Sequence, residues 1–310
     1  MKIAILGRTR WLLDSARALV AAGHRIVCVA TAPAESYYGC GTEEFAALAR
    51  EAGAEFLGVV SLNDAGVLER LQAAGADLAV SINWPTILSA SVIGKFPQGV
   101  INAHCGDLPR YRGNACPNWA ILNGESHIGL CVHMMEPDNV DSGAVLLRDS
   151  LPIGSETYIT DVYAWLDRRI PSLTAEAVTG LATAKLTPVP QPTDPAAALR
   201  CYPRRPEDGR IDWRAPAETP YKLVRATSRP FEGAFTFSED GTRITVWRAR
   251  PFAHPTSFCA VPGQIMLRYD GDPVVACGTG ALRLEEVAIE GIDPAEAKSA
   301  LGRSVRARLL

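Results

Sequence analysis

The sequence lacks the features that mark membrane, secreted and zinc-binding proteins. No apolar run in the chain approaches the roughly 20 residues that a membrane-spanning helix needs. The apolar start of the chain is too short for the hydrophobic region of a signal peptide. The eight cysteines form no Cys-x-x-Cys pair, so we expect reduced, mostly buried thiols and no metal site. These absences predict a cytoplasmic protein without membrane contact.

Two other absences narrow the classes of ligand. The net charge is −3 and the sequence pI is about 6.0, so the overall balance gives no indication of nucleic-acid binding. The first expected strand ends at Gly7, but the Gly-x-Gly-x-x-Gly pattern of a dinucleotide site does not follow it. The pattern Gly-x-x-x-x-Gly-Lys-Ser/Thr of a phosphate-binding loop is also missing. NAD and ATP are therefore disfavoured as ligands.

The first half of the sequence does contain an alternation of strand and helix patterns. Short apolar runs alternate with segments whose apolar residues recur at helical spacing. Strands are expected at 2–6, 25–30, 55–59, 77–82, 99–104 and 130–136, and helices at 11–22, 42–52, 63–74 and 158–181. The last helix is expected to break near Pro171. This alternation predicts an α/β fold with a Rossmann-like, doubly wound, mostly parallel sheet.

The composition changes after Ala184 and divides the chain. Six prolines within 185–206 indicate an extended linker over residues 185–205. Beyond it, strand patterns separated by turn residues such as Glu239-Asp-Gly241 continue to the end of the sequence. We therefore expect a larger domain over 1–184 and a smaller, OB-like β-barrel domain over 206–310.

Residues 100–119 carry the clearest chemical signal. Asn102 and His104 are two residues apart at the end of an apolar strand, so both side chains are expected on the same side. In open α/β sheets, ligands bind at this end of the strands. Asp141, in a polar turn after the next strand, can orient the imidazole and raise its proton affinity. An amide donor, a base and an orienting carboxylate are groups that acyl transfer requires.

Each of these residues also has a structural explanation. An isolated Asn-x-His is often a turn residue beside a half-buried imidazole, and Asp-Ser-Gly is a common turn. Asp107 could compete with Asp141 for His104. The other histidines are assigned to surface loops, to a strand or to the barrel, without a role in the chemistry: His24, His127, His133 and His254.

Three separated motifs resemble, in the same order, those of the 10-formyltetrahydrofolate-dependent formyltransferases. They are Asn102-Ala-His-Cys-Gly-Asp-Leu-Pro-Arg-Tyr-Arg-Gly113, Pro117-Asn-Trp-Ala-Ile-Leu-Asn-Gly-Glu125 and Asp141-Ser-Gly143. The resemblance covers residues 1–180, and 201–213 is similar to the segment that opens the small C-terminal barrel of that family. It implies an N-formyltransferase that uses 10-formyltetrahydrofolate as co-substrate and needs no metal.

The resemblance also implies roles for individual residues. Asn102, His104 and Asp141 would form the catalytic trio. A folate would lie against a loop at 81–88 and a turn at 138–141, with these residues as its contacts: Ser81, Asn83, Trp84, Ile87, Leu108, Asp138 and Val140. Many members carry Ser-Leu-Leu-Pro where this chain has Gly106-Asp-Leu-Pro109, so Asp107 is expected to add a charge near the acceptor.

The amine acceptor is expected to bind just after the catalytic strand, at Arg110, Arg112, Asn114 and Asn118. The two arginines suit phosphate oxygens, although solvated loop arginines are an equal alternative. Together with the negative net charge, they favour a nucleotide-linked amino sugar over methionyl-tRNA. Another small amine, water (as in formyltetrahydrofolate hydrolases) and folate binding without catalysis remain alternatives. Nucleic acid is not an expected partner, whereas a homodimer is compatible with the sequence.

Overall fold

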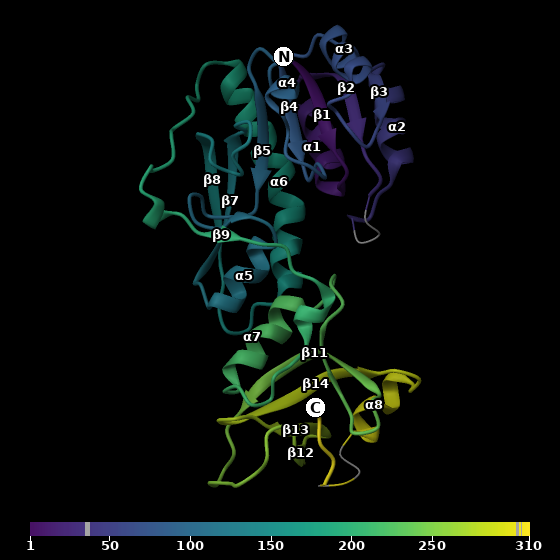
Figure 1. Cartoon of the computed structure of the whole chain (residues 1–310), viewed down its shortest axis with the longest axis vertical. Coiled ribbons are helices and arrows are strands. Elements are labelled where there is room, and N and C mark those ends of the chain that lie inside the picture. Colours follow the sequence, from purple (N-terminus) through teal and green to yellow (C-terminus); the bar gives the residue numbers. More distant parts are fainter. Residues whose placement is uncertain (35–37, 302–303, 305) are drawn as a thin grey trace. The chain divides into compact units, whose positions relative to one another are not determined.

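The computed structural model describes residues 1–34, 38–301, 304 and 306–310 (Figure 1). Its contacts divide the chain into two compact units. The first comprises Met1–Cys116, His127–Pro152 and Tyr163–Tyr202, and the second comprises Pro117–Ser126, Ile153–Val162 and Pro203–Leu310. Two short stretches of the expected domain 1–184 thus pack with the second unit. Most of the expected linker packs with the first unit.

The first unit is built on a seven-stranded mixed sheet (Figure 1). The strands, in spatial order, are β3 Glu55–Gly58, β2 Arg25–Thr31, β1 Lys2–Gly7, β4 Leu78–Ile82, β5 Val100–His104, β7 His127–Met134 and β8 Val145–Pro152. The first five in this order are parallel, β7 is antiparallel to β5, and β8 is antiparallel to β7. The expected Rossmann-like, mostly parallel sheet is confirmed.

Burial explains why these segments form the centre of the sheet. β1 and β4 are apolar runs in which nearly every residue is buried, as is typical of strands covered on both faces. The helices that link the parallel strands are α1 Arg10–Ala21, α2 Thr42–Ala52, α3 Ala65–Ala73 and α4 Ala90–Ile93. This core fixes β5, and with it the position of the polar residues at its carboxyl end.

The long helix α6 spans Ile159–Ala182 and continues through Pro171, so the expected break near this proline is wrong. A proline inside a helix costs about 3 kcal/mol, because one hydrogen bond is lost and the ring meets a carbonyl. The burial of apolar side chains outweighs this cost, since each large aliphatic side chain that is buried contributes about 1.5–3 kcal/mol to stability. The buried residues of this helix include Leu166, Ile170, Leu173 and Val178.

The second unit carries a five-stranded antiparallel sheet. Its strands, in spatial order, are β10 Ala234–Phe237, β11 Arg243–Phe252, β14 Ala281–Ile289, β13 Asp272–Ala276 and β12 Ile265–Tyr269. α7 Glu218–Thr227 contacts β11, and α8 Pro294–Ala300 contacts β14. The remaining elements are short: β6 Arg112–Gly113, α5 Cys116–Asn123, η2 Pro195–Ala197, β9 Arg200–Cys201 and η3 Pro206–Gly209.

Residues 307–310 close this sheet into a barrel. Leu309 pairs with Ser238, next to β10, and Arg308 pairs with Gln264, next to β12. Because β10 and β12 are the two edge strands, a segment bound to both joins the edges of the sheet. The expected small β-barrel is confirmed.

Replacing Gly263 by alanine is expected to destabilise the barrel more than replacing Gly271 by alanine. Both glycines have left-handed backbone, with φ of 85° and 81°, where an alanine costs about 1–2 kcal/mol. A Cβ at position 263 would also collide with the carbonyl of Leu309, whereas one at 271 meets nothing within 4 Å. We expect this overlap to add about 1–3 kcal/mol to the loss of unfolding free energy, measured in urea. Equal losses in the two variants would contradict a stabilising role for the closure.

Candidate functional site

Asn102 and His104 lie at the carboxyl end of β5. Because they are two residues apart in a strand, their side chains share one face of the sheet. Residues of both neighbouring strands flank Asn102, with Ser81 of β4 on one side and His133 of β7 on the other. His104 is 7% exposed. The pair is therefore held between two neighbouring strands of the central sheet.

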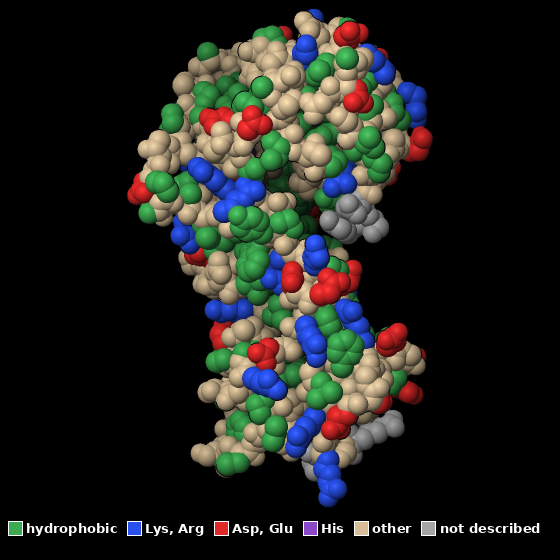
Figure 2. Space-filling view, in the orientation of Figure 1, with side chains coloured by type: hydrophobic (Ala, Val, Ile, Leu, Met, Phe, Trp, Pro, Cys, Tyr) green, Lys and Arg blue, Asp and Glu red, His purple; other side chains and the backbone are tan. Residues whose placement is uncertain are grey.

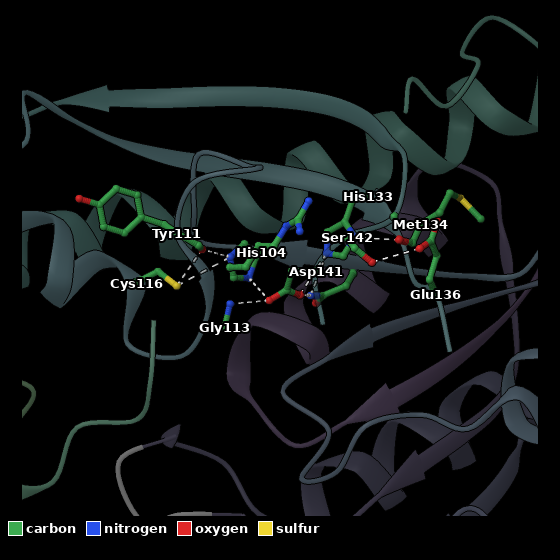
Figure 3. Close-up of polar contacts among 12 residues, drawn as sticks. His104, Tyr111, Gly113, Cys116, His133, Met134, Glu136, Asp141 and Ser142 are labelled. Carbon is green, nitrogen blue, oxygen red and sulfur yellow. Dashed lines mark hydrogen bonds and ion pairs between the residues drawn. The ribbon is translucent and has the colours of Figure 1, made fainter. Parts of the chain in front are cut away.

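Asp141, in the turn between β7 and β8, reaches the same place (Figure 3). Its Oδ2 lies 3.4 Å from Nδ1 of His104 and accepts a 2.8 Å hydrogen bond from the backbone N–H of Gly113. Its Oδ1 lies 3.5 Å from Nδ2 of Asn102. Asp141 has left-handed backbone, with a φ of 53°, and the side-chain amide of Gln191 donates to its carbonyl at 2.8 Å. The structure thus brings the three expected catalytic residues together.

His133, which the sequence indicates as a structural residue, borders the same carboxylate (Figure 3). Its Nε2 lies 3.4 Å from Oδ1 of Asp141 and 3.3 Å from Nδ2 of Asn102. Its Nδ1 lies 2.8 Å from the carbonyl oxygen of Met134. A carbonyl only accepts, so Nδ1 carries a proton, while Nε2 contacts both the Asn102 amide and the Asp141 carboxylate. His133 therefore orients Asn102.

Burial and the two imidazoles set the ionisation of the site. Burial opposes the charge on Asp141, but His104, His133 and the N–H of Gly113 together hold its pKa well below the usual range. Burial lowers the pKa of His104 below its usual value, although Asp141 acts in the opposite direction. Near neutral pH the site therefore contains an ionised carboxylate beside a neutral imidazole, the form that can accept a proton.

The depressed pKa of Asp141 predicts a loss of stability in acid. A carboxyl group whose pKa is lower in the folded than in the unfolded protein stabilises the fold above its unfolded pKa, and this contribution is lost as the pH falls through the folded pKa. We expect Asp141→Asn to flatten the acid limb of a plot of unfolding free energy against pH. The control is Asp64→Asn, because Asp64 is exposed and its side chain makes no capping hydrogen bond. An unchanged acid limb in Asp141→Asn would contradict the assignment.

Asp107 contacts β7 and β8, whereas the carboxylate beside His104 is that of Asp141. Its Oδ2 lies 3.3 Å from Nε2 of His127, and its Oδ1 lies 3.4 Å from Nη1 of Arg148. Gly129 of β7 leaves room for this loop, because a Cβ there would collide with the backbone of Asp107. The charge that departs from the family pattern therefore ties the loop 106–109 to the sheet, and Asp141 is the carboxylate that lies beside the imidazole of His104.

Two of the remaining histidines differ from the surface loops expected for them. His24 is buried, and its Nε2 lies 3.0 Å from Oγ1 of Thr179 in α6. His127 is the first residue of β7. His254 follows β11 in an exposed segment of the second unit, where its Nδ1 contacts Thr256.

The residues expected to contact folate include three that follow β4: Asn83, Trp84 and Ile87. Ile87 is 56% exposed, and Nε1 of Trp84 is buried without a hydrogen-bond partner among the described residues. Asn83 and Asp138 have left-handed backbone, with φ of 54° and 62°. The other members of the expected set are buried or half-buried: Ser81, Leu108 and Val140. An unpaired indole donor beside an exposed isoleucine, at the carboxyl end of a strand, fits a flat ring with polar edges such as a pterin.

Among the four residues expected to bind the acceptor, the side chains of Arg112 and Asn118 donate hydrogen bonds within the protein. Nε and Nη2 of Arg112 donate to Oε1 of Gln191, at 3.2 and 2.6 Å. Within the second unit, Nδ2 of Asn118 donates to a backbone carbonyl at 2.8 Å, and Asn118 is buried. The other two residues are exposed: Arg110 and Asn114. Arg112 thus supports Gln191, which comes from the proline-rich segment and which the sequence does not single out.

The described residues form neither a metal-binding cluster nor a membrane-spanning helix. Within residues 1–34, 38–301, 304 and 306–310, no three His, Cys, Asp or Glu side chains are grouped to hold a metal ion. None of the helices in this described part of the chain is long and apolar enough to cross a membrane. The eight cysteines are free thiols, most of them buried.

Comparison with known proteins agrees with the fold. Residues 1–178 match the formyl transferase family, and residues 204–304 match the C-terminal domain of formyl transferases. The chain therefore belongs to the formyl transferase family. It is an N-formyltransferase, and its co-substrate is the formyltetrahydrofolate that this family uses.

The similarity to individual relatives extends over both units of the chain. The chain is 31% identical to a methionyl-tRNA formyltransferase of Citrifermentans bemidjiense over 297 residues, which are 94% of this chain and 90% of that protein. It is 33% identical to that of Symbiobacterium thermophilum over 304 residues, 96% of this chain and 91% of that protein. Among solved structures, the sugar 3N-formyl transferase WlaRD, in the presence of dTDP and 5-N-formyl-THF, has a TM-score of 0.64 at 12% identity, covering 94% of this chain and 99% of that one.

Proposed function

We propose that this chain formylates the amine of methionyl-tRNA with 10-formyltetrahydrofolate as donor. The observation that carries the proposal is the end-to-end similarity to two methionyl-tRNA formyltransferases, at 31% and 33% identity over at least 90% of each protein. The likeness to the sugar enzyme, at 12% identity, is a likeness of fold. Methionyl-tRNA therefore replaces the nucleotide-linked amino sugar as the first candidate, and a cytoplasmic location suits it.

The distribution of charge supports this acceptor over the sugar. Residues 203–310 contain 16 Lys and Arg against 14 Asp and Glu, whereas residues 1–202 contain 15 against 20. The segment 203–310, which forms most but not all of the second unit, is thus the more basic part of an acidic chain, and this favours contact with a polyanion there. On the face shown in Figure 2, its basic side chains are spread among acidic ones and form no continuous patch. We therefore expect moderate, salt-sensitive tRNA affinity.

The hydrogen bonds of Arg112 also weaken the case for a nucleotide-linked sugar as the acceptor. That acceptor was inferred from two arginines able to bind phosphate oxygens, and one of them is engaged with Gln191 at 2.6 Å. Releasing Arg112 for phosphate would leave the Gln191 oxygen without this donor. Since Gln191 also holds the carbonyl of Asp141, such a movement would disturb the catalytic turn.

The trio supplies the groups that the transfer needs. The bound co-substrate provides an electrophilic formyl carbon. As the amine nitrogen bonds to this carbon, the carbonyl electron pair moves onto oxygen, where the amide N–H of Asn102 stabilises the negative charge. His104 accepts the proton that leaves the amine nitrogen, and Asp141 stabilises the resulting imidazolium. His104 then returns the proton to N10 as the carbon–N10 bond breaks, which yields a formamide and tetrahydrofolate.

The test is an assay of the purified protein with 10-formyltetrahydrofolate and three acceptor conditions. These are methionyl-tRNA, dTDP-linked amino sugars and no amine, with tetrahydrofolate release and formyl-amine formation measured in each. We expect release that depends on methionyl-tRNA and falls with added salt. Formylation of an amino sugar without activity on tRNA would overturn the acceptor, and release without any amine would indicate a hydrolase.

A further inference from the structure

Both ring nitrogens of His104 face oxygen atoms that only accept hydrogen bonds. Nε2 lies 2.6 Å from the carbonyl oxygen of Tyr111, and Nδ1 lies 3.4 Å from Oδ2 of Asp141. At 2.6 Å from a carbonyl, Nε2 must carry a proton. The same carbonyl accepts a second hydrogen bond, at 2.9 Å, from Sγ of Cys116 (Figure 3). The Tyr111 carbonyl is therefore the partner that determines which nitrogen of His104 is protonated.

Gly106 is the residue that lets this carbonyl approach the ring. A Cβ at position 106 would collide with both the Tyr111 carbonyl oxygen and Nε2 of His104. The backbone of Tyr111 is left-handed, with a φ of 60°, a conformation that a bulky residue seldom adopts. Position 106 is also where the chain has glycine in place of the serine of the Ser-Leu-Leu-Pro pattern.

We propose that Gly106 is a positioning residue of the active site. By admitting the Tyr111 carbonyl, it fixes His104 with the proton on Nε2 and leaves Nδ1 as the nitrogen that accepts the proton of the acceptor amine. The catalytic part of this inference rests on the proposed function, whereas the assignment of the tautomer rests on the geometry of the ring.

The distance between Nδ1 and Asp141 agrees with an unprotonated Nδ1. A charge-assisted hydrogen bond between an imidazolium and a carboxylate has a length of about 2.7–2.9 Å, and the observed separation is 3.4 Å. When the amine nitrogen bonds to the formyl carbon, one N–H bond breaks and its proton joins the lone pair of Nδ1. Asp141 can then close on the new N–H, and the same proton leaves for N10 when the carbon–N10 bond breaks.

The pH dependence of this base is set by groups from four parts of the first unit. They are Asp141 of the turn after β7, His133 of β7, Arg200 of β9 and Cys116 at the start of α5. Burial, His133 and Arg200 lower the pKa of His104, while Asp141 and the hydrogen bond to the Tyr111 carbonyl raise it. Loss of that hydrogen bond should therefore lower the pKa further and move the acid limb of the rate profile to lower pH.

The first test is nitrogen-15 NMR of the histidine rings in the full-length protein, without ligand. The His104 signals are assigned by their loss in His104→Asn. Above the pKa of the ring, we expect a protonated-type shift for Nε2 and an unprotonated-type shift for Nδ1. A proton on Nδ1 in the neutral ring would overturn the proposal. This measurement needs neither a Gly106 variant nor formyltransferase activity, so it stands if the proposed acceptor is wrong.

The second test compares Gly106→Ala with Gly66→Ala. Neither glycine has left-handed backbone, and a Cβ at position 66 in α3 meets nothing within 4 Å. For Gly106→Ala we expect mixed tautomers of His104, an acid limb at lower pH and a fall in kcat of about tenfold, part of the roughly 10²–10⁴-fold that a general base contributes. Gly66→Ala should retain all three properties of the wild type. Unchanged tautomer and pH profile in a folded Gly106→Ala would refute the positioning role.

Discussion

His104→Asn is expected to reduce kcat by about 10²–10⁴-fold, the contribution typical of a positioned general base. Asparagine can retain a hydrogen bond to the Tyr111 carbonyl, which Nε2 of His104 makes at 2.6 Å, but it has no nitrogen that titrates near neutral pH. The amine would then have to lose its proton to water. The measurement is the single-turnover rate of formyl transfer at saturating 10-formyltetrahydrofolate.

The control for this variant is His254→Asn, because His254 lies in an exposed segment of the second unit. It should transfer formyl groups at the rate of the wild type. Thermal unfolding of both variants must match the wild type for the rates to be compared. Turnover of His104→Asn within threefold of the wild type would remove His104 from the mechanism.

Asn102→Ala has the second largest expected effect, a rise in the barrier of about 2.7–4 kcal/mol, as for the loss of one donor to an oxyanion. The amide of Asn102 is held by two partners, at 3.3 Å from Nε2 of His133 and 3.5 Å from Oδ1 of Asp141. Both contacts are long, so one N–H can turn from its partner to the oxygen on which the negative charge develops. We expect Asn102→Ala to lower kcat and to leave KM nearly unchanged. Both constants are measured from steady-state rates.

Two comparisons make this test specific. Asn63→Ala, in an exposed segment before α3, should leave kcat unchanged. His133→Phe should lower kcat less than Asn102→Ala does, because it removes the partner that orients the amide and leaves the donor in place. A change in KM alone for Asn102→Ala would instead show that Asn102 binds substrate in the ground state.

The sequence alone was sufficient to predict most strands of the first unit and the proximity of Asn102, His104 and Asp141. Strands such as β1 and β4 are apolar runs between helical segments, and their type follows from local pattern. Asn102 and His104 share a face because of the period of two within one strand. Asp141 comes close to them by another route than the expected one, because β7 is antiparallel to β5 and its last residue, Met134, pairs with Ile101 near the start of β5.

His133 and Gln191 could not be found in this way, because their roles depend on contacts distant in sequence. His133 meets Asn102 only through the antiparallel register of β5 and β7, which no local pattern encodes. Gln191 lies in a proline-rich stretch that reads as a linker, yet its amide donates to the carbonyls of Asp141 and Gly143. The same limit applies to Pro171, where tertiary burial overrides a local helix breaker.

The position of Gln191 has a practical consequence for isolating the catalytic half of the enzyme. The amino-acid composition suggests that the first domain ends at residue 184. A fragment ending there would lack the side-chain amide of Gln191, which holds the Asp141 turn, and the β9 strand, which pairs with β6. Any truncation, protease cut or fusion junction should therefore fall after Tyr202, where the first unit ends. A protein clipped between 185 and 202 would keep its central sheet and lose its chemistry.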